Sequence, residues 1–361
     1  MLLKRMDKKK LISNIVAVAL LIVFSILIEG GTTLPKIVNL ILIYSIGALS
    51  LNVICGCLGE FVLGHGGFLL IGYTVFVLIS TLLKNYIDPT FFKQNIYTIL
   101  GGKLHILGYL LVIGIILICA VVTGLIGLLV GSIALGRLKG DYLAIVTLGI
   151  SLIFVNIAKN FKSFGGAAGI GSSSFIGGTP LLYAIFLVVV VFLIMTFMKS
   201  RFGRAILACR DDNIAAEASG VPVNKTKVIA FTFASFIAGI AGGLLANYTT
   251  YAPTTFGQDR SILFLIIIVL GGLGSLTGSI IASGLIVLYE QWFCQQTWVP
   301  DFFTSNPKII YGIILVLIML FRSSGILGTS EFTWDWFYKK SKKSWDKIKT
   351  VFKKKTPKEV E

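Results

Sequence analysis

The chain alternates long apolar runs with shorter polar connections over most of its length. A helix needs about 20 predominantly apolar residues to span the hydrocarbon core of a bilayer. Lipid offers no hydrogen-bond partner to open backbone groups, so each apolar run is expected to be helical. The pattern therefore predicts an all-α, polytopic integral membrane protein, with apolar runs at residues 11–28, 37–55, 68–83, 104–135, 141–161, 181–198, 228–247, 261–293 and 309–321.

Two of these runs leave the number of spans open. Residues 104–135 exceed the length of one span, so this helix tilts, extends past the bilayer or breaks at one of its glycines. Residues 261–293 are interrupted by a glycine-rich stretch and form either two short spans or a re-entrant pair. We expect about ten transmembrane segments in total, or eight plus a re-entrant pair.

Composition supports the membrane class, because 56% of the residues are hydrophobic and only 13% are charged. The net charge of +16 would suggest nucleic acid as the partner of a soluble protein. Here Lys and Arg lie at the ends of apolar runs, where the positive-inside rule places them. We therefore expect the lipid bilayer as the environment and no nucleic-acid partner. The five cysteines lie mostly in or beside apolar runs and indicate no disulfide framework.

Basic residues also predict the orientation. They concentrate in residues 1–10, in the central connection 199–227 and in the tail 329–361. An even number of spans places all three on one side, which the positive-inside rule makes the cytoplasm. The chain thus divides into a basic cytoplasmic amino-terminal segment, a transmembrane domain at residues 11–328 and a basic cytoplasmic tail.

The central connection is predicted to carry a helix of about two turns. Asp211 or Asp212 can cap its start, and Gly220 supplies a left-handed stop. Glu217 lies near the carboxyl end, where a negative charge opposes the helix dipole and costs roughly 0.3–1 kcal/mol. This acid and a slim surface of small residues indicate a partner protein, although a helix packed on its own neighbours explains the spacing equally well. The small residues are Ala215, Ala216, Ala218 and Ser219.

A second notable stretch, residues 56–67, is glycine-rich and a poor candidate for continuous helix. It contains Glu60 and His65, and ionisable groups between apolar runs usually face protein or a water-filled path. A cytoplasmic turn with both groups solvated is the simpler interpretation. Broken helices line transport paths in many transporters, so the candidates for pore lining or hinges are Glu60, Gly64, His65, Gly271 and Gly274.

Several enzyme classes are excluded by the sequence. The chain lacks the phosphate-binding Gly-x4-Gly-Lys-Ser/Thr motif and the Gly-x-Ser-x-Gly motif of hydrolases, and its two histidines cannot form a His-Glu-x-x-His zinc site. We expect no catalytic, cofactor-binding or metal-ligating residues. The apolar runs also contain few of the carboxylates that ion-driven transporters bury. A permease driven by a separate ATPase fits both absences.

Five stretches in order resemble the permease subunits of bacterial ABC importers for branched-chain amino acids, specifically the LivM-type subunit. The resemblance extends over about residues 51–328. Its motifs are GEFVLGHGGFLLIGY at 59–73, DYLAIVTLG at 141–149, GRA at 203–205 with RDDNIAAEASG at 210–220, VLGGLGSLTG at 269–278, and FRSSGILG at 321–328.

The resemblance implies an ABC importer permease fold in the bacterial cytoplasmic membrane. It implies two ABC ATPase subunits, a homologous second permease and an extracytoplasmic amino acid binding protein as partners. ATP would be bound by the ATPase subunits, so this chain would need no cofactor. The central helix would be the coupling helix that docks on an ATPase, with Arg210, Asp211, Asp212, Ala215, Ala216, Glu217, Ala218 and Gly220 as coupling residues.

The chain departs from the family's usual residues at Glu60, where Gln is common, and at Thr277 and Ser323, where Pro is common. These differences concern the substrate and not the role. A permease of the same family for urea or short amides, sugars or nucleosides is the alternative. An intramembrane enzyme or a membrane scaffold is a more distant one.

Overall fold

The computed structural model describes residues 34–86, 105–135, 140–161, 166, 180–249 and 252–295, together with residues 312, 313, 316, 320 and 325. These residues form helices and connections without any strand. The predicted span 11–28, the amino-terminal segment 1–10 and the tail 329–361 lie outside the described residues, as does most of the run 309–321. The α-helices are α2 (Leu34–Asn52), α3 (His65–Tyr86), α5 (His105–Ala134), α6 (Asp141–Asn160), α7 (Pro180–Lys199), α8 (Arg201–Asp211), α9 (Asn213–Ala218), α10 (Val223–Tyr248), α11 (Gln258–Gly271) and α12 (Leu276–Gln291).

Six of these helices are long and apolar enough to cross a membrane, and they coincide with six of the predicted runs. They are α2 with the π-helical turn Val53–Leu58 that extends it, α3, α5, α6, α7 and α10. Helix α5 is one uninterrupted helix of 30 residues, so the long run 104–135 does not break at a glycine. Helices α11 and α12 have 14 and 16 residues and are separated at the predicted interruption.

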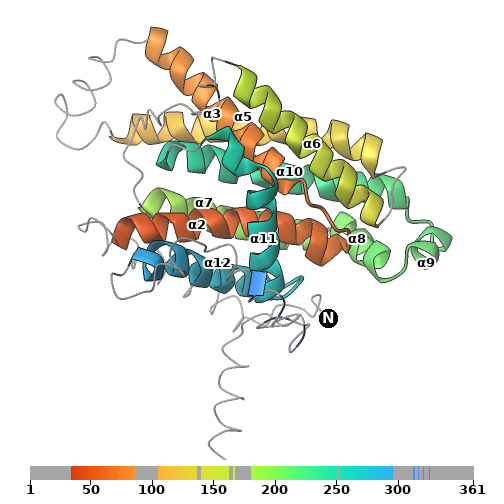
Figure 1. The fold of residues 1–361 in the computed structure, drawn as a ribbon. Coiled ribbons are helices and arrows are strands. Elements are labelled where there is room, and N and C mark those ends of the chain that lie inside the picture. Colours follow the sequence, from red (N-terminus) through yellow and green to blue (C-terminus); the bar gives the residue numbers. More distant parts are fainter. Residues whose placement is uncertain are drawn as a thin grey trace, which may run out of the picture.

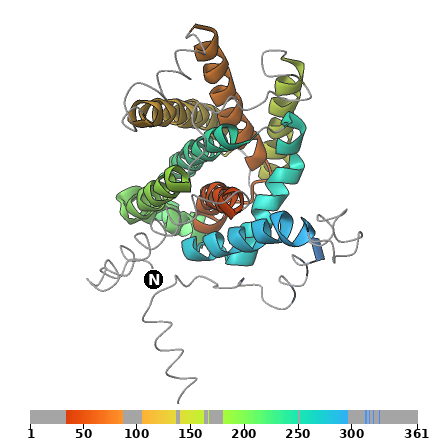
Figure 2. The same cartoon turned by 90° about the vertical axis from the view of Figure 1, so that its left-hand side faces the viewer.

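Helix α2 occupies the centre of the molecule. Of the residues in its apolar window 89% are buried, compared with 33% for α6. Figures 1 and 2 show α2 surrounded by α7, α10, α11 and α12, with α11 running across the direction of α2 in both views. Helices α5, α6 and α7 turn apolar side chains outward, among them Ile133, Ile145 and Phe192. Such faces remain exposed in a bilayer because lipid tails are as apolar as the side chains.

Helices α3 and α10 cross with almost no space between their backbones. A Cβ atom on Gly72 would lie 2.5 Å from the carbonyl oxygen of Gly239, and one on Gly242 would lie 2.2 Å from that of Leu69. The small residues at 238–243 of α10 therefore let the two helices meet closely at this crossing. By contrast, a Cβ on Gly114 of α5 would meet no atom within 4 Å.

We predict that Gly72→Ala destabilises the fold by about 1–3 kcal/mol, because the added methyl group overpacks a backbone contact. Gly114→Ala adds the same methyl group at an open helix position, and we expect it to be neutral or slightly stabilising. The midpoint of thermal unfolding of the purified protein in detergent would measure both. Equal midpoints for the two variants would contradict the close crossing of α3 and α10.

Candidate functional site

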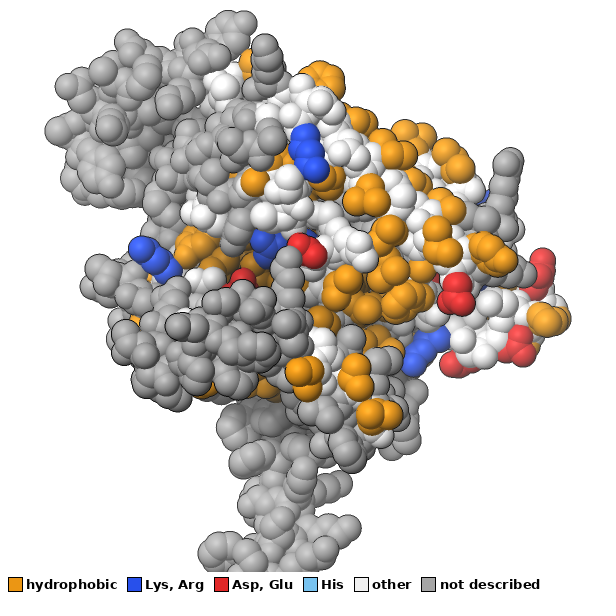
Figure 3. All heavy atoms as spheres, in the orientation of Figure 1, with side chains coloured by type: hydrophobic (Ala, Val, Ile, Leu, Met, Phe, Trp, Pro, Cys, Tyr) orange, Lys and Arg blue, Asp and Glu red, His pale blue; other side chains and the backbone are white. Residues whose placement is uncertain are grey.

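Helices α8 and α9 extend beyond the bundle at one end of the molecule (Figure 1). Helix α7 ends at Lys199, and the hydroxyl of Ser200 caps α8 by accepting a hydrogen bond from the Gly203 backbone N–H at 3.3 Å. The predicted connection 199–227 thus contains two helices, of which only α9 was expected. Exposed acidic side chains gather at this end (Figure 3), and they include Asp211, Asp212 and Glu217.

The predicted two-turn helix is confirmed as α9, and Asp212 is the capping residue. Its Oδ1 atom accepts hydrogen bonds from the backbone N–H groups of Ile214 at 2.7 Å and Ala215 at 3.2 Å. The Ser219 hydroxyl donates to the Ala215 carbonyl at 2.8 Å. The helix ends before Gly220, whose φ of +81° lies in the left-handed region that glycine adopts most readily.

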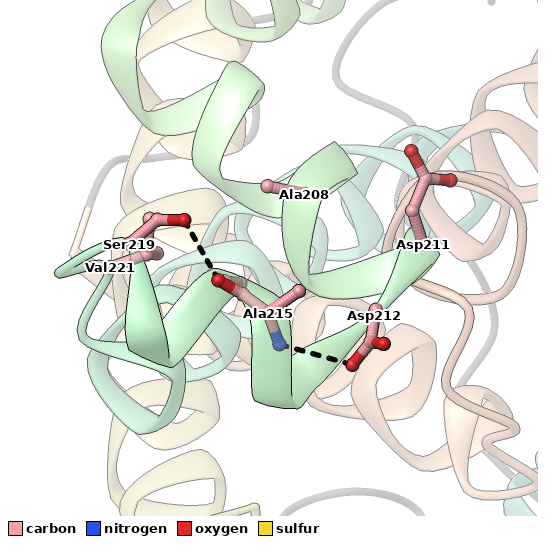
Figure 4. A pocket seen from close by; sticks show the side chains of 7 residues that line it. Ala208, Asp211, Asp212, Ala215, Ser219 and Val221 are labelled. Atoms are coloured by element: carbon pink, nitrogen blue, oxygen red, sulfur yellow. Dashed lines mark hydrogen bonds between the residues drawn. The ribbon is translucent and has the colours of Figure 1, made fainter.

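A shallow groove of about 200 Å³ lies between α8 and α9. Figure 4 shows Asp211 and Asp212 at one end of the groove and Ser219 and Val221 at the other. The remaining lining residues are small and apolar. They are Ala208, Ala215 and Ala216.

The residues of α9 do not all face outward. Ala216 is buried and belongs to a small apolar cluster, so the expectation that it contributes to an open surface is wrong. The other predicted coupling residues, from Arg210 to Gly220, are exposed. Ile214 is 81% exposed and is the one large apolar side chain of α9, and sequence reasoning missed it as a contact residue. The cluster, here called the α9 cluster, consists of Cys57, Leu58, Ile206, Cys209, Ala216 and Ala230.

The α9 cluster contains one thiol outside the membrane-spanning helices, that of Cys209. Burial raises its pKa above the ordinary value, and the positive charge of Lys227 partly offsets this effect. A buried, protonated thiol is a weak nucleophile and a poor metal ligand. We therefore assign Cys209 a packing role. No group of three potential metal ligands occurs in the part of the chain that the structure describes.

The break between α2 and α3 contains the predicted candidates Glu60 and Gly64, and the candidate His65 follows directly. Helix α2 ends in the π-helical turn, and α3 begins at His65. The His65 side chain is buried, with its Nε2 atom 2.8 Å from the Ser50 hydroxyl and 3.1 Å from the Gly47 carbonyl oxygen. The interpretation as a turn with both groups solvated is therefore wrong for His65, and it is also wrong for Glu60, whose side chain is 11% exposed. Glu60 forms an ion pair with Lys227 of α10.

Of the other two candidates, Gly271 is the last residue of α11 and Gly274 lies in the break between α11 and α12. Asn52, at the end of α2, is fully buried and binds this turn with its side-chain amide. It accepts from the Gly274 backbone N–H at 2.9 Å and donates to the Ser275 carbonyl at 3.0 Å. A polar residue inside a long apolar run is the signal that could have identified Asn52.

Arg210 of α8 lies against both breaks. A Cβ atom on Gly59 would lie 3.1 Å from the Arg210 Cγ atom, and one on Gly274 would lie 3.4 Å from its Nη1 atom. The structure therefore brings Arg210, the end of α2 and the turn after α11 together. Gly64 packs against α6, where a Cβ atom on it would lie 2.1 Å from the Thr147 carbonyl oxygen.

We predict that Asp212→Ala weakens α9 by about 1 kcal/mol, because two backbone N–H groups lose their acceptor. Hydrogen exchange of the α9 amides should accelerate about fivefold, since 1.4 kcal/mol corresponds to tenfold. Asp212→Asn keeps an oxygen acceptor and should exchange at nearly the original rate. An unchanged rate in Asp212→Ala would contradict the capping role.

Taken together, the membrane-length helices around a buried central helix and the helix pair at one end define an all-helical, multi-pass membrane protein. A family model described as "Branched-chain amino acid transport system / permease component" matches residues 33–319. The chain therefore belongs to this family of membrane permeases. Members of the family are transporter subunits of ABC importers and are in general not catalytic; they function with ATPase and binding-protein partners in the inner membrane.

Individual relatives agree with the family. The chain is 29% identical to the high-affinity branched-chain amino acid transport system permease protein LivM of Escherichia coli, over 90% of this chain and 77% of the relative. It is 25% identical to a probable LivM protein of Methanocaldococcus jannaschii, over 60% of this chain and 69% of the relative. It is 26% identical to the autoinducer 2 import system permease protein LsrD of Salmonella paratyphi B, over 71% of this chain and 81% of the relative. No solved structure matches the chain.

Proposed function

We propose that this chain is the transmembrane permease subunit of an ABC importer for branched-chain amino acids. With a homologous second permease it forms the path across the membrane. Two separate ATPase subunits drive transport, and an extracytoplasmic binding protein delivers the substrate. The match of the permease family to residues 33–319 carries this proposal, and the relatives named for branched-chain amino acids support the substrate class.

The proposed orientation places α8, α9 and both termini in the cytoplasm. The basic residues of the connection 199–227, such as Arg201 and Arg204, support it through the positive-inside rule. The ATPase subunits bind ATP in this arrangement, and the permease requires no cofactor of its own. Helix α9 then lies where an ATPase can reach it.

The geometry of α9 suits docking into a groove of another protein. Ile214 supplies an exposed apolar anchor, and such anchors dominate the energy of many interfaces. Glu217 is exposed beside it at the carboxyl end of the helix, where a basic side chain of the ATPase would relieve its unfavourable position relative to the dipole. When the ATPase subunits close on ATP, they would displace α9 and reorient the helices connected to it.

The transport proposal predicts ATP-dependent uptake of labelled leucine. The chain would be purified with its partner permease and ATPase subunits and reconstituted into vesicles with the binding protein. We expect leucine to accumulate only with ATP and binding protein present, and unlabelled isoleucine or valine to compete. If urea, ribose or autoinducer 2 competed and these amino acids did not, the branched-chain assignment would be wrong. Autoinducer 2 is included because the chain has relatives named as autoinducer 2 permeases.

We also predict that Glu217→Lys lowers substrate-stimulated ATP hydrolysis of the reconstituted complex about tenfold, because like charges would then face each other at the docking site. The matched control is Asp141→Lys, which makes the same charge change at an exposed position of α6. The control should retain the original rate. Full stimulated activity of Glu217→Lys at normal expression would refute the docking role.

A further inference from the structure

A buried ion pair joins two segments that are far apart in the sequence. The ammonium group of Lys227, in the second turn of α10, donates to the Glu60 Oε1 atom in the break between α2 and α3. The side chain of Lys227 is 5% exposed and that of Glu60 is 11% exposed. Buried ion pairs often contribute little to stability, because desolvation offsets their attraction. A buried ion pair can nevertheless make the two segments that it joins move together.

On one side of the pair, the connection from α9 to Lys227 is short and hydrogen-bonded. The Val221 backbone N–H donates to the Ala216 carbonyl at 3.0 Å, which ties this connection to α9. The backbone N–H and the hydroxyl of Thr226 both donate to the Pro222 carbonyl, at 2.9 and 3.0 Å. Because these bonds hold the first turn of α10 to α9, a displacement of α9 also displaces Lys227.

On the other side of the pair, Glu60 is bound to the end of the central helix. It follows Gly59, and the backbone N–H groups of both residues donate to the Ile54 carbonyl, that of Glu60 at 3.3 Å. Ile54 belongs to the π-helical turn that extends α2. A force on the Glu60 carboxylate therefore acts on the end of α2, the most buried of the membrane-length helices.

The α9 cluster provides a second, different contact between the same segments. It contains Ala216 of α9 together with Cys57 and Leu58 of the π-helical turn. Helices α8 and α10, which supply its other members, contact both α9 and the π-helical turn and so connect them. Apolar packing resists compression strongly, but each atomic contact attracts only weakly when the segments are drawn apart. An ion pair in surroundings of low dielectric constant resists separation over a longer distance. The two contacts thus transmit opposite directions of movement.

From this geometry we infer that Glu60 and Lys227 are positioning residues that couple outward movement of α9 to the end of α2. The inference rests on the proposed function, because it assumes that an ATPase moves α9. Closure of the ATPase pushes α2 through the α9 cluster, and the return movement draws it back through the ion pair. Without the pair, ATP hydrolysis would continue while the path reoriented incompletely.

The test is the amount of leucine transported per ATP hydrolysed by the reconstituted complex. The principal variant, Glu60→Leu with Lys227→Met, removes both charges, so that no unpaired charge stays buried and the protein should fold. We expect leucine per ATP to fall about tenfold, within the range of typical coupling energies. Thermal stability and assembly with the ATPase should remain near those of the original complex. Lys225→Met removes an exposed charge two residues away and serves as the matched control with an unchanged ratio.

Two further variants separate coupling from folding. Glu60→Gln retains an oxygen that accepts from Lys227, and we expect it to keep leucine per ATP within about twofold, because the hydrogen bond persists with a weaker charge component. The exchange variant, Glu60→Lys with Lys227→Glu, restores a pair of opposite sign and should recover much of the ratio that the apolar variant loses.

The inference would be overturned if the apolar double variant kept the original amount of leucine per ATP. It would also be overturned if this variant failed to assemble with the ATPase, because the pair would then serve folding alone. A third contradictory result would be that Glu60→Gln loses as much leucine per ATP as the apolar variant and that the exchange variant recovers none. Failure of the proposed function looks different, because the unmodified complex itself would then show no ATP-dependent leucine uptake.

Discussion

Backbone polar groups in a bilayer must find partners within the protein, and this constraint determines where the helices of this chain can break. Two breaks among the described residues, 59–64 and 272–275, both adjoin the end of α2. The buried side-chain amide of Asn52 forms hydrogen bonds with backbone groups of the second break. A Cβ atom on Gly56 would lie 2.4 Å from the Gly274 nitrogen, so the turn also packs directly on the π-helical turn. Gly274 and Ser275 of the second break are thus buried against the end of α2.

These breaks also connect the interior to the exposed end of the molecule. Arg210 rests on both of them, and it lies in the last turn of α8, which only Asp212 separates from α9. The α9 cluster and the pair of Glu60 with Lys227 add two more contacts from the same end. The helix pair α8–α9 is therefore joined to the end of the central helix by Arg210 and by the α9 cluster, and the second turn of α10 is joined to it by the ion pair. In a permease that is moved by a separate ATPase subunit, these contacts would allow a displacement of α8 and α9 to reach the transport path.

Much of this architecture could be predicted from the sequence, because apolar runs and capping residues act locally. The six long helices, the capped helix α9 and the interruption after α11 follow from that local information. Contacts between distant segments could not be predicted: Glu60 and Lys227 are 167 positions apart, and Asn52 and Gly274 are 222 apart. The six residues of α9 are also too few for periodicity to show that Ala216 faces inward and Ile214 outward.

The central claim is that a separate ATPase moves this permease through α9. Photo-crosslinking from position 214 in the assembled complex, in native membranes, tests it most directly, because Ile214 is the large exposed apolar side chain of that helix. A probe at Ile145, which is 64% exposed on α6, serves as the control. The account predicts that position 214 crosslinks to a nucleotide-hydrolysing subunit and position 145 does not. Crosslinks from position 214 to lipid or to this chain alone would contradict it.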